Sequence, residues 1–372
     1  MNMSLQQEIE KRAKQIHTDG YSLSIGELMS LYKDKEIDIH PEFQRFFRWT
    51  ATQTTKLIES ILLGIPIPPI FVSQREDGVW DVIDGLQRLS TILEFAGLLR
   101  DAEDNVRPGT SLSGTDYLPS LEGKYWQKDD EPHNSFDLPQ RLIVKRSKLG
   151  VQIIKKESDI DTKFELFQRL NTGGTALTEQ EIRNCILVMI NKDFYTWLGG
   201  ISKNPNFQAT IPITEKAQEE QYDVELALRF LVYKNITSAD FTKDVGKLLT
   251  DKVIEFASNG HFDYENEKRI FDKVFLLLNK ALGEDVFRKW DQGKDKFSGP
   301  FSISAFETIA LGLAKKLDLY EDTPESVEKL REIIKGVSQN PIFIDKSGSG
   351  KRAPTRVPYL LPLGEKLFGN ED

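Results

Sequence analysis

Residues 79–95, VWDVIDGLQRLSTILEF, place two different hydrophobic patterns in direct succession. An apolar run typical of a strand stops at Asp84-Gly85. Beyond it, apolar residues recur at the spacing of the buried stripe of a helix, at Leu89, Ile92, Leu93 and Ala96. Upstream, Asp77-Gly78 separates two apolar runs and indicates a hairpin turn. This stretch therefore predicts a hairpin whose second strand runs through a tight turn directly into a helix.

A turn of this kind is a candidate anion site. The first N–H groups of a helix lack partners within the helix, and together with the helix dipole they favour phosphate. Gly85 lets the backbone approach a ligand, Arg88 offers a forked donor for phosphate oxygens, and Gln87 can orient a water. Asp84 can hold Mg²⁺ or pair with an arginine. The structural alternative is that Asp84 caps the helix and Arg88 forms a surface ion pair, and local sequence leaves both open.

The rest of the N-terminal half alternates short strands and helices. Ser24-x-x-Glu27 and Thr50-x-x-Gln53 resemble capping boxes that open helices, the second of which ends near Gly64. A short strand is expected before His40-Pro41. Residues 97–140 are rich in Gly, Pro, Asp and Ser and predict an irregular insertion. The next two apolar segments predict another strand pair, QRLIVKRS (140–147) and LGVQIIKK (149–156).

The C-terminal half is predicted to be helical from about residue 205 onward. Before it, two helices are interrupted by Asn171-Thr172-Gly173-Gly174. Thr178-x-x-Glu181 caps the second helix, whose inner face is formed by Ile182, Cys185, Ile186, Met189 and Ile190. Further start signals are Ser304-x-x-Glu307 and Thr323-Pro324. We therefore expect three segments: a helical extension (1–20), a mixed domain with the irregular insertion (21–200) and a helical domain (201–372).

Charge, cysteine content and length limit the class of protein. The 372 residues suggest two or three domains, and no apolar run approaches the ~20 residues of a membrane span. A single cysteine, Cys185, suits a reducing cytoplasm. The net charge of −9 argues against indiscriminate wrapping of nucleic acid, although local basic patches occur at 141–156 and 346–356. For each patch alone, a solvated surface is the simpler interpretation.

The succession of blocks resembles a known family. PEFQRFFRW (41–49), the hairpin, DVIDGLQRLSTILEF (81–95) and FQRLNTGGTALTEQEIRN (167–184) follow the order seen in the N-terminal domain family of the GmrSD type IV restriction systems. The resemblance covers roughly residues 20–195. It implies an α+β fold similar to the ParB/sulfiredoxin superfamily, followed here by a mainly α-helical domain. In ParB-like proteins a comparable strand–turn–helix grips nucleotide phosphates.

The resemblance also implies site residues. The family's hallmark is Asp-Gly-Gln-Gln-Arg, which this chain matches at Asp84, Gly85, Gln87 and Arg88 but not at Leu86. If the missing amide serves catalysis, the leucine weakens hydrolysis while binding survives. If that side chain normally faces away, the change has little effect. The further nucleotide-binding residues expected from the resemblance are Gln44, Arg45, Asn171, Thr172, Gly173, Gly174, Arg183 and Asn184.

Several of these residues also have simpler structural interpretations. Asn171 to Gly174 can form a helix C-cap, although the second glycine and Thr172 exceed what a cap requires. Arg183 and Asn184 can brace that loop instead of reaching the nucleotide. Glu181 is expected to complete a capping box, with metal ligation beside Asp84 as the less favoured alternative.

We expect an NTP-binding, NTP-hydrolysing component of an anti-phage or type IV-like restriction system, using Mg²⁺ and acting on or sensing DNA. The four histidines form no metal-ligand spacing and no Walker lysine motif is present, so nuclease activity is expected in a partner chain. An HNH nuclease chain and an ATPase chain are the candidate partners. The first alternative is a non-catalytic DNA sensor that recruits a nuclease. A weaker alternative is a Mg²⁺-dependent nickase that uses Asp84 and Glu181.

Overall fold

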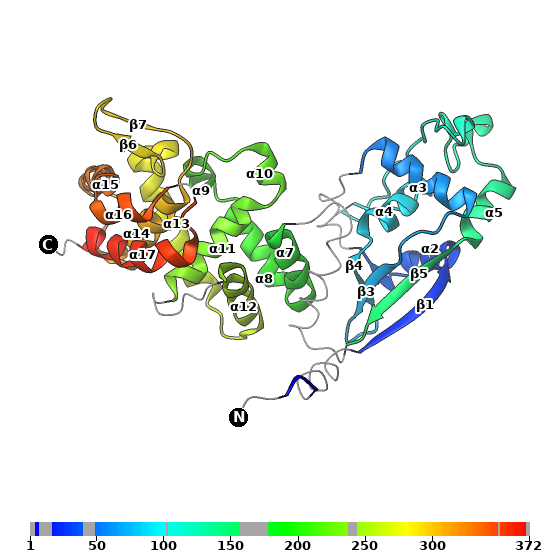
Figure 1. Cartoon of the computed structure of the whole chain (residues 1–372), viewed down its shortest axis with the longest axis horizontal. Coiled ribbons are helices and arrows are strands. Elements are labelled where there is room, and N and C mark those ends of the chain that lie inside the picture. Colours follow the sequence, from blue (N-terminus) through cyan, green and yellow to red (C-terminus); the bar gives the residue numbers. More distant parts are fainter. Residues whose placement is uncertain are drawn as a thin grey trace. The chain divides into compact units, whose positions relative to one another are not determined.

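The computed structural model describes residues 4–6, 17–39, 49–101, 103–156, 178–236, 244–348 and 350–369, without the side chain of Met189. The chain divides into two compact units, 1–176 and 177–372. Each unit is described by itself (Figure 1). Residues 7–16 of the predicted N-terminal extension lie outside the described part of the chain, and the first strand begins at Thr18.

The first unit is built on a five-stranded mixed sheet with the order β1-β5-β3-β4-β2. β3 and β4 form the predicted antiparallel hairpin, β5 runs parallel to β3 and antiparallel to β1, and β2 runs parallel to β4. The strands are β1 (Thr18–Ser24), β2 (Ile37–Asp38), β3 (Ile70–Gln74), β4 (Trp80–Asp84) and β5 (Lys148–Ile154).

Four helices pack with this sheet, and three of them were predicted. The helices are α2 (Ile25–Lys33), α3 (Ala51–Leu63), α4 (Leu86–Phe95) and α5 (Leu138–Arg146). Ser24 accepts a hydrogen bond from the N–H of Glu27, and Thr50 and Gln53 form a reciprocal capping box, as their sequence signatures indicate. The core contains the predicted inner stripe of α4 packed with central strand residues, including Leu89, Leu93, Ile70, Val72 and Val151.

The predicted strand at 140–147 is wrong, because this segment lies in helix α5. Asp137 and Gln140 form a capping box at its start, and Pro139 occupies the first turn, where a missing N–H is tolerated. Only Val144 of this helix is buried. The strand partner of β5 is β1 instead, from the beginning of the unit. A short apolar run does not by itself distinguish a strand from a helix. Here the capping box before the run indicates the helix.

The insertion at 97–140 is largely irregular, as expected. It contains two short 3₁₀ turns, Pro119–Leu121 and Pro132–Asn134, before α5 begins. Its chain is held by backbone bonds such as Leu112 N–H to Lys124 O at 2.9 Å. The aromatic rings of Trp126 and Phe136 from this insertion pack on Phe95 at the end of α4. The insertion therefore covers the C-terminal end of α4.

The second unit is mainly helical, with one small hairpin (Figure 1). Its hairpin consists of β6 (Lys289–Asp291) and β7 (Lys296–Ser298). Its described helices of four or more residues are α7 (Glu179–Ile190), α8 (Lys192–Ser202), α9 (Pro205–Thr210), α10 (Glu215–Glu219), α11 (Tyr222–Lys234), α12 (Val245–Ser258), α13 (Tyr264–Leu282), α14 (Ile303–Lys315), α15 (Pro324–Val337), α16 (Pro341–Lys346) and α17 (Ala353–Gly369).

Two start signals in this unit had different outcomes. Thr323 caps α15, with Pro324 at its first position, as predicted. The signal at Ser304 is wrong, because Ser302 is the cap of α14 and Ser304 and Glu307 are buried inside the helix. Together the two units confirm the α+β class with a helical C-terminal region. Within the described ranges, no helix combines the length and apolar character needed to cross a membrane.

Candidate functional site

The predicted turn between β4 and α4 is formed by Gly85 alone. Strand β4 ends at Asp84, α4 begins at Leu86, and Gly85 is the N-cap residue with φ of 89°. A Cβ atom at this position would lie 2.4 Å from Cγ2 of Ile70. Glycine is thus required both by the left-handed backbone and by the close approach of β3. It also follows that the N-cap residue has no side chain with which to cap the helix.

The guanidinium of Arg88 folds back over this turn. Its Nη2 donates to Oδ2 of Asp84 at 2.9 Å and to the carbonyl oxygen of Pro69 at 3.1 Å. The Arg88 side chain is only 18% exposed, whereas that of Asp84 is 35% exposed. Arg88 Nε is buried and has no hydrogen-bond acceptor among the described residues. A buried donor without an acceptor is costly, and an oxygen-rich ligand would satisfy it.

Leu86 and Gln87 occupy the first turn of α4 in different environments. Leu86 is partly buried and packs against the hydrophobic core of the first unit. In this chain the position of the hallmark's first glutamine is therefore used for packing. Gln87 is half-buried, adjacent to Arg88. The turn thus brings Asp84, Gln87 and Arg88 together within one strand–helix junction.

Among the described residues, Asp84 offers one carboxylate to a divalent cation at this turn. Among the residues that the structure describes, no group of three or more His, Cys, Asp or Glu side chains could hold a metal ion. Mg²⁺, however, is commonly bound by one or two carboxylates together with substrate phosphates and waters. The partly exposed carboxylate of Asp84 fits that kind of binding and does not fit a metal cage made of protein alone.

Glu181 lies in the second unit and serves as a capping-box residue. Its Oε2 accepts a hydrogen bond from the N–H of Thr178 at 2.7 Å, and Thr178 Oγ1 accepts from the N–H of Glu181 at 3.2 Å. The side chain is fully buried in α7. Glu181 therefore completes the capping box that the sequence predicts. Asp84 belongs to the other unit.

Arg183 is buried in a network of polar groups. Its side chain is 1% exposed and donates to Thr250 Oγ1 at 3.1 Å, Gln180 Oε1 at 3.0 Å and Glu179 Oε2 at 2.8 Å. Burial lowers the pKa of Arg183, and the charges of Glu225 and Glu179 act against that shift. All these partners belong to the second unit.

Asn184 is also buried on α7. Its Oδ1 accepts from Nε2 of Gln180 at 2.9 Å, so that Gln180 links Asn184 to Arg183. Within the described part of the chain, Asn184 Nδ2 has no partner. The other expected nucleotide-binding residues lie outside the described residues, and their role stays a prediction: Gln44, Arg45, Asn171, Thr172, Gly173 and Gly174.

A second charged cluster, which the sequence did not predict, lies at the opposite end of β4. Arg75 pairs with Asp38 at 2.7 Å and also with Asp81, whose side chain is 1% exposed. Burial alone would lower the pKa of Arg75, but its hydrogen bonds to Asp81 and Asp38 raise it. The signal in the sequence was a carboxylate at an inward position of an apolar strand, which requires a partner. This cluster joins β2, the turn of the hairpin and β4.

Comparison with known proteins identifies the family of the first part of the chain. The model of the family described as GmrSD restriction endonuclease, N-terminal domain, matches residues 25–188. The match contains the hairpin, the Gly85 turn and all but the last two residues of α7. No curated protein and no solved structure matches the chain, so the resemblance to ParB/sulfiredoxin folds stays a prediction. Residues 25–188 are therefore a domain of the GmrSD restriction endonuclease N-terminal family.

Proposed function

We propose that the Asp84–Arg88 turn binds the phosphates of an NTP with Mg²⁺, and that this chain is the nucleotide-hydrolysing component of a restriction system that acts on or senses DNA. The observation that carries the proposal is the buried Nε donor of Arg88, which has no acceptor among the described residues. It lies beside a helix N-terminus whose cap residue is a glycine. Both features favour an anion with several oxygens.

The ion pair between Asp84 and Arg88 defines how the site would respond to the nucleotide. A phosphate that accepts hydrogen bonds from Arg88 replaces the Asp84 carboxylate as its partner. The freed carboxylate of Asp84 is then available to Mg²⁺, which when bound neutralises phosphate charge. Gln87, in the same helical turn, is the group we assign to orient the attacking water. Arg88 neutralises charge as it develops on the phosphoryl oxygens.

One observation favours a second candidate, a DNA sensor that binds nucleotide without hydrolysing it. Leu86 packs against the core where the family hallmark has a glutamine. If that amide takes part in hydrolysis elsewhere in the family, this chain retains binding alone. In both cases the nuclease is proposed to reside in a partner chain, and an HNH nuclease chain and an ATPase chain are the candidate partners. The nickase alternative is weakened because Glu181 is engaged as a capping residue.

The test combines nucleotide binding with phosphate release. Thermal unfolding of the full chain is measured with each of the four NTPs and Mg²⁺, since a ligand of the native state raises its stability by mass action. Phosphate release is then followed with and without DNA. Arg88→Met is compared with Arg146→Met, which alters an exposed arginine of the same unit.

The expected result is NTP stabilisation that Arg88→Met abolishes and Arg146→Met retains. Phosphate release by the wild-type chain supports the hydrolase, whereas stabilisation without release supports the sensor. Full turnover by a folded Arg88→Met variant would place the reaction elsewhere. Native folding of each variant is checked by its unfolding transition without ligand.

A further inference from the structure

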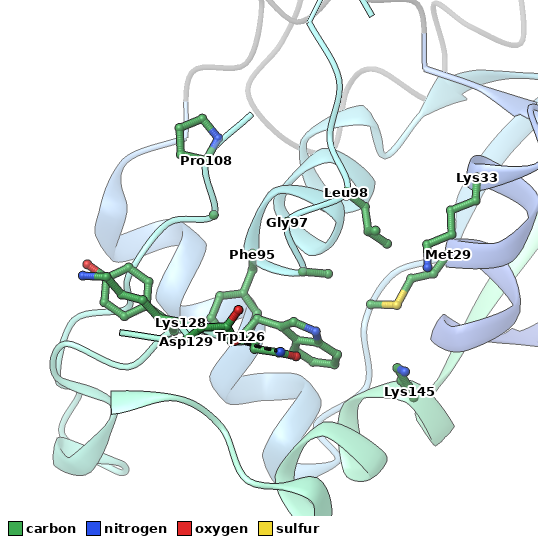
Figure 2. Close-up of a pocket in the computed structure, with 14 residues that line it drawn as sticks. Met29, Lys33, Phe95, Gly97, Leu98, Pro108, Trp126, Lys128, Asp129 and Lys145 are labelled. Atoms are coloured by element: carbon green, nitrogen blue, oxygen red, sulfur yellow. Dashed lines mark hydrogen bonds between the residues drawn. The ribbon is translucent and has the colours of Figure 1, made fainter. Parts of the chain in front are cut away.

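The first unit contains a pocket of about 560 Å³ at the C-terminal end of α4. It is bounded by α2, by α5, by the end of α4 and by the insertion (Figure 2). Because α4 has ten residues at about 1.5 Å each, this pocket and the Gly85 turn lie roughly 15 Å apart along the helix. The volume falls within the range of about 300–1,000 Å³ that is usual for small-molecule sites.

Trp126 forms an aromatic wall of the pocket and packs against Phe95, which also lines it. The rings of Trp126 and Phe95 form a T-shaped pair with a centroid distance of 5.8 Å, and Phe95 forms another with Phe136 at 5.2 Å. The flanking backbone is fixed by hydrogen bonds from Tyr125 N–H to Asn134 O and from Phe136 N–H to Tyr125 O, both 2.8 Å. An aromatic face positioned in advance can stack on a planar group without further ordering.

Three lysines line the pocket, but only two of them have uncompensated charges. Lys128 forms an ion pair with Glu131 and lies over the Tyr125 ring. Within the described ranges, neither Lys33 nor Lys145 is paired with a carboxylate. Figure 2 shows these two lysines reaching from α2 and α5 to the side of the pocket that Met29 and Trp126 share. Two free cations in a chain of net charge −9 mark a local preference for an anion.

The position of Lys145 is set by close packing of its helix. The backbone carbonyl oxygen of Lys145 lies 3.2 Å from where a Cβ atom of Gly26 would be. The glycine in α2 therefore lets α5 approach closely. The Lys145 ammonium lies 6.0 Å from the centroid of the Trp126 ring. Cation and aromatic face are thus presented together, although they come from different elements.

One acidic residue, Asp129, also lines the pocket beside the three lysines. Asp129 lies on the lining, and its Oδ1 accepts a hydrogen bond from Nε2 of Gln127 at 3.1 Å. Gln127 is held in turn by Arg141 at 2.9 Å. A side-chain carboxylate beside the aromatic wall provides an acceptor for the N–H groups of a base. The lining therefore offers a stacking face, two cations and an acceptor.

We propose that this pocket binds one nucleotide unit, with its base against Trp126 and its phosphate between Lys33 and Lys145. Stacking on an aromatic side chain combined with basic residues is how proteins hold unpaired nucleotides. The unit can come from an unpaired stretch of a DNA strand or from a free nucleotide. This pocket is separate from the Gly85 turn, and the proposal does not depend on NTP binding there.

The test measures affinity of the full chain for a fluorescent single-stranded oligothymidylate, for the same length of duplex DNA and for free thymidine monophosphate. Two variants probe the pocket: the double change Lys33→Gln with Lys145→Gln, and Trp126→Leu. Lys56→Gln is the matched control, because Lys56 is an exposed lysine on α3 of the same unit, away from the pocket. Trp126→Phe keeps an aromatic face. All variants are checked for unchanged unfolding temperature.

We expect the double lysine variant to weaken binding and to reduce the slope of log K against log salt by about 0.7 for each phosphate that is no longer neutralised. Trp126→Leu is expected to weaken binding about tenfold, within the range for loss of one stacked base, and Trp126→Phe to restore most of it. If the variants lose affinity for the oligonucleotide alone, the bound nucleotide unit comes from a DNA strand. If they lose affinity for thymidine monophosphate equally, it comes from a free nucleotide. Variants that bind as Lys56→Gln does would overturn the proposal.

A failed NTP site would have a different signature. In that case Arg88→Met would leave phosphate release unchanged while the pocket variants still showed weakened oligonucleotide binding. Conversely, the pocket variants could bind the oligonucleotide as the wild type does, while the NTP response still depended on Arg88. That result would overturn the proposal for the pocket and support the proposal for the Gly85 turn. The two sites are therefore tested independently.

Discussion

Nη2 of Arg88 donates to both the Asp84 carboxylate and the Pro69 carbonyl, so that one guanidinium ties the end of β4, the entry to β3 and the first turn of α4 together. This ion pair is only partly exposed. In the proposed chemistry the two residues act apart from each other, because Arg88 binds the phosphate and Asp84 holds Mg²⁺. A ligand at the turn must therefore compete with an existing intramolecular contact.

Asp84→Asn is expected to separate nucleotide binding from metal dependence. The amide retains an acceptor for Arg88 but loses the charge that holds Mg²⁺. NTP should still raise the unfolding temperature, and the additional rise caused by Mg²⁺ should disappear. Glu76→Gln, which removes an exposed carboxylate of the same hairpin, should behave as wild type. An Asp84→Asn variant with an intact Mg²⁺ effect would exclude this carboxylate as the metal ligand.

Gly85→Ala is expected to destabilise the first unit by about 3 kcal/mol, because it adds a steric clash to an unfavourable backbone conformation. The new Cβ would lie 2.4 Å from Cγ2 of Ile70. Gly78→Ala is the matched control. Gly78 has φ of 90°, but no atom lies within 4 Å of an added Cβ.

Gly78→Ala should cost about 1 kcal/mol, the backbone contribution alone. Urea unfolding measures both variants, and the difference between them isolates the close approach of β3 to the turn. Equal effects of the two substitutions would mean that the approach of Ile70 relaxes without cost.

Leu86→Gln restores the family hallmark and tests why this chain departs from it. Because Leu86 is partly buried against the core, the amide is expected to lower the free energy of unfolding by about 1 kcal/mol. Phosphate release is measured beside stability. A rise in turnover would show that the leucine suppresses hydrolysis, while unchanged turnover with lower stability would show that the position serves packing.

Glu307→Gln is expected to destabilise the second unit by about 3–5 kcal/mol, because it leaves Arg356 buried without its counter-charge. Glu307 is fully buried and receives two hydrogen bonds from Arg356, at 2.7 and 2.8 Å. Thermal unfolding gives the measurement. Asp322→Asn removes one partner of the half-exposed Lys280 pair and should cost less than about 1 kcal/mol. If the two substitutions lowered the free energy of unfolding by similar amounts, burial would not be what makes the Glu307–Arg356 pair important for stability.

Cys185 is expected to resist thiol reagents in the native protein. It is buried in α7, and burial, together with the nearby charge of Glu181, raises the pKa of the thiol. The reactive thiolate is therefore scarce as well as inaccessible. Reaction with a chromogenic disulfide at pH 8 should be slower by about a hundredfold or more than in denaturant, given the ordinary pKa of about 8.5 for a free thiol. Rapid native labelling would indicate local opening of α7.

Local signals predicted several helices correctly, among them two in the first unit and one in the second. The capping residues of α2, α3 and α7 lie within three residues of their partners, so the sequence displays them directly. The apolar run at 140–147 was assigned to a strand because its short length fits either structure. The β6–β7 hairpin has no clear signal in the sequence, because each of its strands has only three residues.

By itself, the sequence determined where the strand–turn–helix lies and which side chains it carries, because backbone conformation at Asp84-Gly85 depends on neighbouring residues. Only the tertiary structure decided what those side chains contact. The acceptor from Pro69 and the close approach of Ile70 come from β3 and the segment before it, and the pocket unites Lys33, Trp126 and Lys145 from three separate elements. Contacts between residues far apart in the chain depend on how the elements pack, and no local periodicity records that packing.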